Sequence, residues 1–332
     1  MPTLTSAHDL ITAIPFLIGF HPTDSIVLIS IKDEAIGLAM RIDLPQSLRS
    51  DEIDLLAHHF LREEADAALL VAYMPEDRDD GDSLLICLGA GLIKSGIHIQ
   101  ESLVVRGGRY RSIICRDETC CSSLGEKLPD IESTEIAVEH VVAGIPMPYA
   151  NIEELRESLA ADSQSHDGQW LELIAQFHID DESESLQELR RDGIETMDLL
   201  FDDFRMGRGA SERVLVARMI GRMSDVQVRD YALGVHSEDT FDIYFTMWRE
   251  LLRLAPSGYV APIACIVAAM SYESGDGALA QKALDRAFGD DESYPLAGLL
   301  RRVFNAGWPP ESFAQMRREL HPKVIDAIFD GQ

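Results

Sequence analysis

The segment from residue 106 to residue 121 concentrates the most reactive side chains of this sequence. It holds four arginines and three cysteines, namely Arg106, Arg109, Arg111, Arg116, Cys115, Cys120 and Cys121. On a strand, Arg109 and Arg111 would share one face, because alternate side chains point the same way. Two guanidinium groups on one face can hold a phosphate or a carboxylate. The alternative is a solvated strand whose arginines pair with the protein's own acidic surface.

The cysteines leave three interpretations open. Four residues separate Cys115 from Cys120, as in one half of a zinc site, but a structural zinc site usually takes two such pairs and no second pair follows. A disulfide from Cys115 would require an exposed thiol of low pKa, and Arg116 is the only evident activator. We favour the third interpretation, in which the cysteines are small buried hydrophobes at the end of a strand. We therefore expect no cofactor, with zinc as the alternative.

The stretch "GFHPTDS" brings together His21, Asp24 and Ser25. Catalytic triads are assembled in space from rigid elements, so adjacency in the sequence is poor support for one. Pro22 and Asp24 are typical turn residues. We therefore predict no catalytic residue and keep His21, beside the arginines, as a candidate ligand-binding side chain. A protein without enzymatic activity is expected, and an enzyme is the alternative.

The elements that would position these residues form an α/β domain over residues 1–148. Short apolar runs rich in β-branched residues predict strands at 25–31, 36–44, 66–74, 97–105 and 109–115. Ser6 is a candidate cap for a first helix that Pro15 would close, and further helices are predicted at 50–65 and 82–95. Gly107 and Gly108 predict a hairpin. Helical connections mixed with hairpins predict a mixed sheet with packed helices.

Residues 149–332 are predicted to form a helical domain. Helical periodicity predicts helices at 151–161, 168–177, 184–205, 211–223, 238–254, 260–272, 277–288, 295–305 and 311–328. Ala280, Ala283 and Ala287 form a seam of small residues that allows a neighbouring helix to approach closely. This part is similar to the second helix of a tetratricopeptide repeat, but an array needs about three units. We expect a helical bundle with a tetratricopeptide-like end.

The composition restricts the partners. The chain has 57 acidic and 29 basic residues, for a net charge of −28. Because nucleic-acid binding depends mainly on phosphate neutralisation by Lys and Arg, we expect no nucleic-acid partner. His8, Asp9 and Pro15 interrupt the first apolar stretch, and no basic segment precedes it, which fits neither a signal peptide nor a membrane span. We expect a cytoplasmic protein with reduced thiols and no membrane partner.

Several segments resemble one family across most of the chain. They are "DLITAIPFLIGFHPTDSIVLIS" (9–30), "VVRGGRYRSIICRDETCC" (104–121), "GDGALAQKALDRAF" (275–288) and "YPLAGLL" (294–300). They resemble an actinobacterial family catalogued as domain of unknown function 4192. The resemblance implies a bacterial cytoplasmic protein with these two halves, but no reaction and no catalytic residue. This chain departs from the family at Arg111, where many relatives carry an aromatic residue, and at "SSLGEKL" (122–128), where they have a Pro/Gly-rich loop.

Two functions remain open. We expect a non-catalytic interaction or regulatory scaffold, whose helical domain binds protein partners that include copies of itself. The alternative is a small-ligand sensor or enzyme that uses the arginines and cysteines of 106–121 against the sheet.

Overall fold

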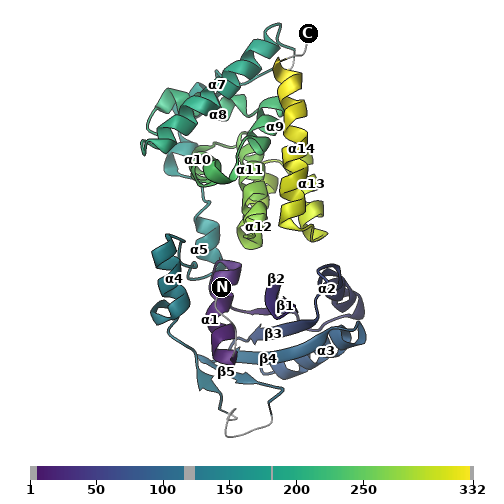
Figure 1. Cartoon of the computed structure of the whole chain (residues 1–332). Coiled ribbons are helices and arrows are strands. Elements are labelled where there is room, and N and C mark those ends of the chain that lie inside the picture. Colours follow the sequence, from purple (N-terminus) through teal and green to yellow (C-terminus); the bar gives the residue numbers. More distant parts are fainter. Residues whose placement is uncertain (1–5, 116–123, 181, 330–332) are drawn as a thin grey trace. The chain divides into compact units, whose positions relative to one another are not determined.

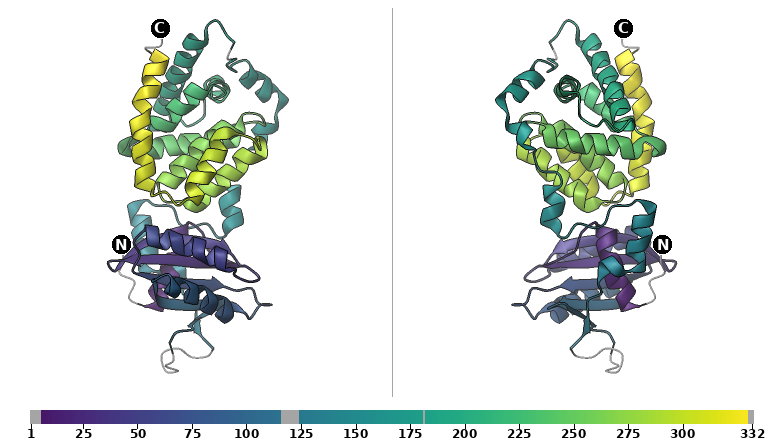
Figure 2. Two further views of the ribbon diagram at one scale, coloured as in Figure 1. Left: turned by 90° about the vertical axis from the view of Figure 1, so that its right-hand side faces the viewer. Right: turned by 90° about the vertical axis from the view of Figure 1, so that its left-hand side faces the viewer.

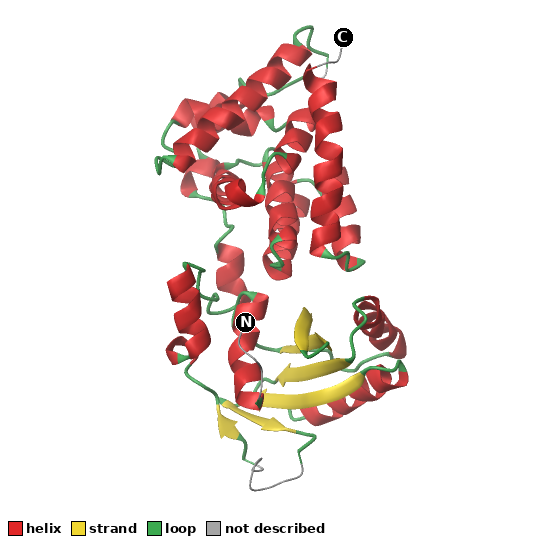
Figure 3. Ribbon diagram, viewed as in Figure 1, coloured by secondary structure: helices red, strands yellow, loops and turns green. Residues whose placement is uncertain are grey.

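The computed structural model describes residues 6–115, 124–180 and 182–329. The chain folds as two compact units, Met1–Leu155 and Arg156–Gln332. Figure 3 shows the strands in the first unit, whereas the described part of the second unit consists of helices and loops. A mixed α/β sheet followed by a helical region is the architecture that the sequence predicted. Among the described helices, none is both long and apolar enough to cross a membrane.

The first unit is built on a mixed six-stranded sheet. The strands are β1 (Ser25–Lys32), β2 (Ala35–Asp43), β3 (Ala67–Tyr73), β4 (His98–Arg106), β5 (Arg109–Ser112) and β6 (Glu126–Lys127). Their order across the sheet is β2-β1-β3-β4-β5-β6. Only β3 and β4 are parallel, and every other neighbouring pair is antiparallel. A crossover helix joins the parallel pair, as the geometry of such a connection requires.

Two tight hairpins join neighbouring strands of this sheet. Asp33 and Glu34 join β1 to β2 with φ angles of 50° and 63°, a left-handed conformation that suits the twist of a two-residue hairpin. Gly107 and Gly108 join β4 to β5 with φ angles of 57° and 72°. The hairpin at Gly107 and Gly108 was predicted. Strand β5 is shorter than expected, because the Ser112 hydroxyl accepts hydrogen bonds from the backbone N–H groups of Ile114 and Cys115 and turns the chain away.

Helices cover both faces of the sheet. On one face, which we call the α3 face, α2 (Ser50–Arg62) and α3 (Gly81–Lys94) lie against the sheet (Figure 2). They share a hydrophobic core with the buried side chains of Leu28, Leu70 and Val104. The opposite face, which we call the α1 face, carries the alternate strand residues and is covered by α1 (Ala7–Ile18). Buried on both faces, β1 and β3 are continuous apolar runs, as is typical of central strands.

Helix α1 departs from the prediction at its end. The Ser6 hydroxyl accepts from the Asp9 N–H, as expected of a cap. Pro15 was expected to close the helix but lies inside it, and the helix ends at Gly19, whose φ of 82° is left-handed. Proline removes one helix hydrogen bond and its ring crowds the carbonyl four residues earlier, but packing of the surrounding apolar residues offsets this cost. The consequence is that Pro15 lies on the α1 face of the sheet.

The sequence patterns missed two further elements of the first unit. Helix α4 (Glu135–Ala143) begins at Thr134, whose side chain accepts from the Ala137 N–H, and ends at Gly144. The two-residue strand β6 is too short to leave a pattern in the sequence. Helix α5 (Ile152–Glu157) follows α4.

The second unit is helical over its described residues (Figure 1). Its helices are α6 (Gly168–Ala175), α7 (Leu186–Arg205), α8 (Arg213–Arg222), α9 (Val226–Gly234), α10 (Phe241–Leu254), α11 (Val260–Glu273), α12 (Gly277–Asp290), α13 (Pro295–Asn305) and α14 (Pro310–Phe329). Helix α9 was not predicted. Ala280, Ala283 and Ala287 are fully buried on α12, which packs extensively against α11. The predicted small-residue seam is therefore a helix-packing surface.

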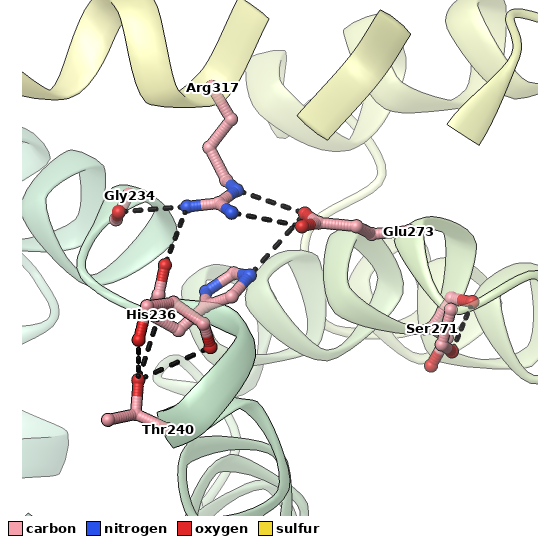
Figure 4. A network of polar contacts seen from close by, with 8 residues as sticks. Gly234, His236, Thr240, Ser271, Glu273 and Arg317 are labelled. Atoms are coloured by element: carbon pink, nitrogen blue, oxygen red, sulfur yellow. Dashed lines mark hydrogen bonds and ion pairs between the residues drawn. The ribbon is translucent and has the colours of Figure 1, made fainter. Parts of the chain in front are cut away.

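A buried polar network joins α9, α11 and α14 (Figure 4). The Arg317 guanidinium donates to both Glu273 carboxylate oxygens at 2.9 Å, and also to the backbone oxygens of Gly234 and His236. The His236 ring lies 3.4 Å from Glu273 through Nε2. Bidentate pairing satisfies both charges inside the unit and fixes the end of α9. We interpret this network as structural.

Candidate functional site

One edge of the sheet gathers the loops of the first unit. Strands β3 and β4 run parallel and end there at Tyr73 and Arg106, and the antiparallel β1 begins there at Ser25. The loop before β1, the loop after β3 and the turn after β4 therefore meet at this edge. In open α/β sheets, ligands bind in the crevice at the carboxyl ends of parallel strands.

The strand register decides which arginines lie together. Arg106 is the cross-strand partner of Arg109, and Val104 is the partner of Arg111. Directly opposed residues of an antiparallel pair lie on the same face. Arg106, Arg109 and Arg111 therefore all lie on the α3 face, next to the start of α3.

These arginines line a cavity of about 200 Å³, which we call the arginine cleft. Its lining is Met74, Arg78, Asp79, Gly81, Asp82, Val104, Arg106, Arg109, Tyr110, Arg111, Leu124 and Gly125. Four guanidinium groups meet two carboxylates in this lining, whereas the chain as a whole has about twice as many acids as bases. The lining of the cleft is therefore net positive, whereas the protein as a whole is net negative.

Two of the four arginines are neutralised by carboxylates. Arg78 donates through Nε and Nη2 to Asp80, and this hydrogen bond lowers the pKa of the Asp80 carboxyl. Arg111 Nη2 lies 2.5 Å from Asp82 Oδ1, at the first turn of α3. Both pairs are partly exposed, so each contributes only about 0–1 kcal/mol to folding.

The other two arginines contact backbone carbonyls instead. Arg106 Nη2 donates to the Glu76 oxygen at 2.5 Å, and Arg109 Nη1 donates to the Gly125 oxygen at 2.8 Å. A carbonyl orients a guanidinium group but carries no charge to neutralise it. A guanidinium has five N–H donors, so each keeps donors for a ligand. The cleft can therefore offer a pair of oriented positive charges to an anion.

A larger cavity, of about 660 Å³, opens on the α1 side of the same edge and is called here the α1-side cavity. Ile11 and Pro15 contribute to it from α1, and His21, Tyr73 and Val105 contribute from the sheet edge. The His21 backbone N–H donates to the Tyr149 oxygen at 2.9 Å. Burial lowers the pKa of the His21 ring, against a smaller opposing effect of Glu132, so the imidazole is neutral near pH 7.

The predicted ligand-binding residues are thus divided between two cavities. Arg109 and Arg111 line the arginine cleft, His21 lines the α1-side cavity, and Arg106 lines both. Arg116 lies outside the described residues. Arg78 and Asp82 were not predicted as site residues, because the run "EDRDDGD" (76–82) resembles a solvated acidic loop. Its position directly after a buried strand was the available signal.

The cysteines that the structure describes are separated. Cys115 is half-buried just beyond β5, Cys87 is exposed, and Cys265 is buried in the second unit. Burial raises the pKa of the Cys265 thiol to about 12. Cys120 and Cys121 lie outside the described residues. Over the described part of the chain, no three His, Cys, Asp or Glu side chains are grouped so that they could hold a metal ion.

Comparison with curated proteins and with solved structures finds no match for this chain. A family model described as "Domain of unknown function (DUF4192)" matches residues 8–311. The match covers the sheet edge with both cavities and most of the helical unit. The chain therefore belongs to the DUF4192 family.

Proposed function

We propose that the first unit is a small-ligand-binding module that recognises an anionic group, a phosphate or a carboxylate, in the arginine cleft. The observation that carries the proposal is the convergence of Arg106, Arg109 and Arg111 on one face at the carboxyl end of β3 and β4. Guanidinium groups bind phosphate and carboxylate through paired, charge-assisted hydrogen bonds. Drug-sized ligands occupy about 300–1,000 Å³, so a cleft of about 200 Å³ suits one anionic group rather than a whole cofactor.

A nuclear magnetic resonance titration of the full chain tests this proposal. Inorganic phosphate and succinate would be added in separate experiments at constant ionic strength, because exposed charges are screened by salt. We expect saturable shifts of the backbone amide signals of Gly81, Gly107 and Gly125 with at least one of the two anions. The difference between the two titrations identifies the preferred anionic group. Shifts that stay linear, or that equal those caused by chloride, would contradict an anion site.

A second candidate function is protein binding. Helix α4 exposes Val138, Val141 and Val142 to 56%, 67% and 82%, and Ile145 after it is exposed to 50%. Neighbouring exposed apolar side chains are typical of an interaction surface. We infer a second copy of the chain as the occupant; the sequence led us to expect self-association through the helical domain, whereas these side chains lie in the first unit. The tetratricopeptide-like end of the helical unit and a cytoplasmic location belong to the same scaffold hypothesis and stay predictions.

Light scattering on two variants tests the second candidate. Val142→Lys places a charge among the exposed apolar side chains of α4. Lys94→Gln changes an exposed residue at the end of α3 and is the control. A dimer in the unsubstituted chain that becomes a monomer only with Val142→Lys would support self-association. A monomer at all concentrations would contradict it.

A further inference from the structure

The α1-side cavity adjoins the arginine cleft, with which it shares Met74 and Arg106, but most of the charged residues in its lining are acidic. Its volume of about 660 Å³ lies within the range of small-molecule sites, about 300–1,000 Å³. The proposed anion site does not use it. Ile11, Pro15, Val105 and Leu128 give it an apolar lining. Such a lining binds the hydrocarbon part of a ligand, while a few polar groups fix its orientation.

Tyr73 brings a polar group, its hydroxyl, to this cavity. It ends β3, lines the cavity and is 8% exposed. No hydrogen bond joins its hydroxyl to another of the described residues. Burial raises the pKa of the Tyr73 hydroxyl, so it stays protonated and can both donate and accept. Because Tyr73 lines the cavity, a ligand or water there can complete the hydrogen bonds of this hydroxyl.

The charged residues of the cavity are mostly acidic. Asp24, Glu76, Asp130 and Glu132 lie in its lining, and all four are exposed residues at its rim. The cationic side chain of the lining is Arg106, which donates to the Glu76 carbonyl. His21 adds no charge near pH 7, because burial lowers its pKa.

The arrangement of these carboxylates suits an organic cation better than a metal ion. Within the described residues, no three acidic, His or Cys side chains converge closely enough to hold a metal ion. Carboxylates spread around a rim instead create a negative potential at the mouth of a cavity with low-dielectric walls. Such a field favours an organic cation, in which the charged group is attached to a larger molecule, over a metal ion.

We propose that the α1-side cavity binds a small organic amine, whose apolar body packs on Ile11, Pro15 and Val105 and whose ammonium group lies among the rim carboxylates. The Tyr73 hydroxyl supplies a hydrogen bond to the bound molecule. This inference goes beyond the anion site, since it concerns a different cavity, on the other face of the sheet, and a ligand of opposite charge.

Three matched probes test the charge preference. Phenethylamine, 2-phenylethanol and phenylacetate share a phenyl ring and differ in a positive, neutral or negative end group. Each would be titrated into the full chain and followed through the backbone amides of Thr23, Glu76 and Glu132. We expect phenethylamine to bind at least about tenfold more tightly than phenylacetate, and its affinity to fall as salt is added. Equal affinities, tighter binding of phenylacetate, or no saturable binding of the amine would overturn the proposal.

Two variants test the residues, and each has a matched control. Tyr73→Phe keeps the apolar ring and removes the hydroxyl, so we expect phenethylamine binding to weaken about threefold to tenfold. Glu132→Gln removes one rim charge without changing its size and should weaken binding about threefold. Glu139→Gln, on α4 and outside the cavity lining, is the control for charge and should leave binding unchanged. Unchanged affinity in both test variants would overturn the proposal.

The two sites can be told apart. Phosphate titration of Tyr73→Phe should give the same affinity as the unsubstituted chain, because Tyr73 does not line the arginine cleft. Phenethylamine titration of Arg109→Gln should likewise be unaffected, because Arg109 does not line the α1-side cavity. If phosphate does not bind but phenethylamine does, the anion site is wrong and the amine site is still supported. If phenethylamine and phosphate compete for one site, the amine proposal is wrong.

Discussion

Arg106 and Arg109 stand directly opposite each other across the β4–β5 hairpin, although both carry a positive charge. Like charges at directly opposed positions destabilise an antiparallel pair. Neither guanidinium is neutralised by its hydrogen bond, since both acceptors are backbone carbonyls. The hairpin therefore holds two like charges together at the arginine cleft, which is unfavourable for the hairpin and favourable for an anion.

The first prediction separates stability from binding at this pair. In Arg109→Gln, the repulsion is removed, so the thermal unfolding midpoint of the first unit should stay the same or rise. Loss of a charged hydrogen bond to the ligand, about 1.5–3 kcal/mol, should weaken phosphate binding by tenfold or more. Calorimetry gives both quantities. Lys127→Gln is the control for binding: it removes a like charge opposite Arg109 as well, but Lys127 lies outside the cleft lining, so phosphate affinity should not change. An Arg109 variant that binds phosphate normally would argue against the proposed site.

The second prediction concerns Asp82, which neutralises Arg111 at the cleft. In Asp82→Asn, Arg111 is released from its carboxylate and the cleft gains one unit of positive charge. Phosphate affinity should rise about threefold to tenfold, while folding changes by less than about 1 kcal/mol, because the ion pair is partly exposed. Asp54→Asn, on the exposed side of α2, is the matched control. Weaker phosphate binding in Asp82→Asn would mean that Asp82 orients Arg111 for the ligand. It would contradict the prediction that Asp82 competes with phosphate for Arg111.

The third prediction tests the backbone that holds Arg109. Gly125 has a φ of 71°, and an added Cβ would lie 2.6 Å from the backbone oxygen of Tyr110. Gly125→Ala should therefore destabilise the first unit by about 2–4 kcal/mol, and weaken phosphate binding because Arg109 loses its fixed carbonyl. Gly108→Ala shares the left-handed backbone, with a φ of 72°, but its Cβ would meet nothing within 4 Å. We expect it to lose only about 1 kcal/mol. If urea unfolding shows that Gly125→Ala and Gly108→Ala lose the same unfolding free energy, the contact with the Tyr110 backbone oxygen does not contribute.

The fourth prediction is that acid destabilises the helical unit through the network of His236, Glu273 and Arg317. Burial lowers the pKa of the His236 ring, so the unfolded chain takes up a proton below about pH 6.5 that the folded chain does not. Burial opposes ionisation of Glu273, but hydrogen bonds from His236 and Arg317 outweigh it and lower its pKa to about 2, from 4.5. Its stabilising contribution is complete above about pH 4.5 and is lost as the pH falls towards 2.

Tryptophan fluorescence can follow this unit by itself, because Trp170, Trp248 and Trp308 all lie in it. In urea, the unfolding free energy should fall between about pH 7 and pH 5, and fall further below pH 4.5. His236→Phe keeps the ring contact with Phe241 but cannot titrate, so it should flatten the decrease between pH 7 and pH 5. His58→Phe, exposed in the first unit, is the control and should not flatten it. An unchanged pH profile in His236→Phe would exclude His236 as the titrating group.

Local patterns in the sequence were enough to predict most elements. The apolar runs of β1 and β3, the Gly107–Gly108 hairpin and the long amphipathic helices depend on contacts between near neighbours. For the same reason, Arg109 and Arg111 could be assigned to one face. Elements whose stability comes from distant contacts were missed, such as α9, whose end is fixed by Arg317 of α14. Pro15 was expected to end α1, but packing carries the helix past it.

The sequence by itself therefore determined an acidic α/β and helical chain with an arginine-rich strand, because charge and periodicity are properties of the chain. Only the tertiary structure decided which side chains share a cavity. The pairing of β3 with β4 brings residues 21, 73–82 and 104–111 to one edge, although they are far apart in the sequence. The sheet then separates Arg109, which lies on the α3 face, from His21, which precedes β1 and lines the α1-side cavity. No spacing within a single segment can report that separation.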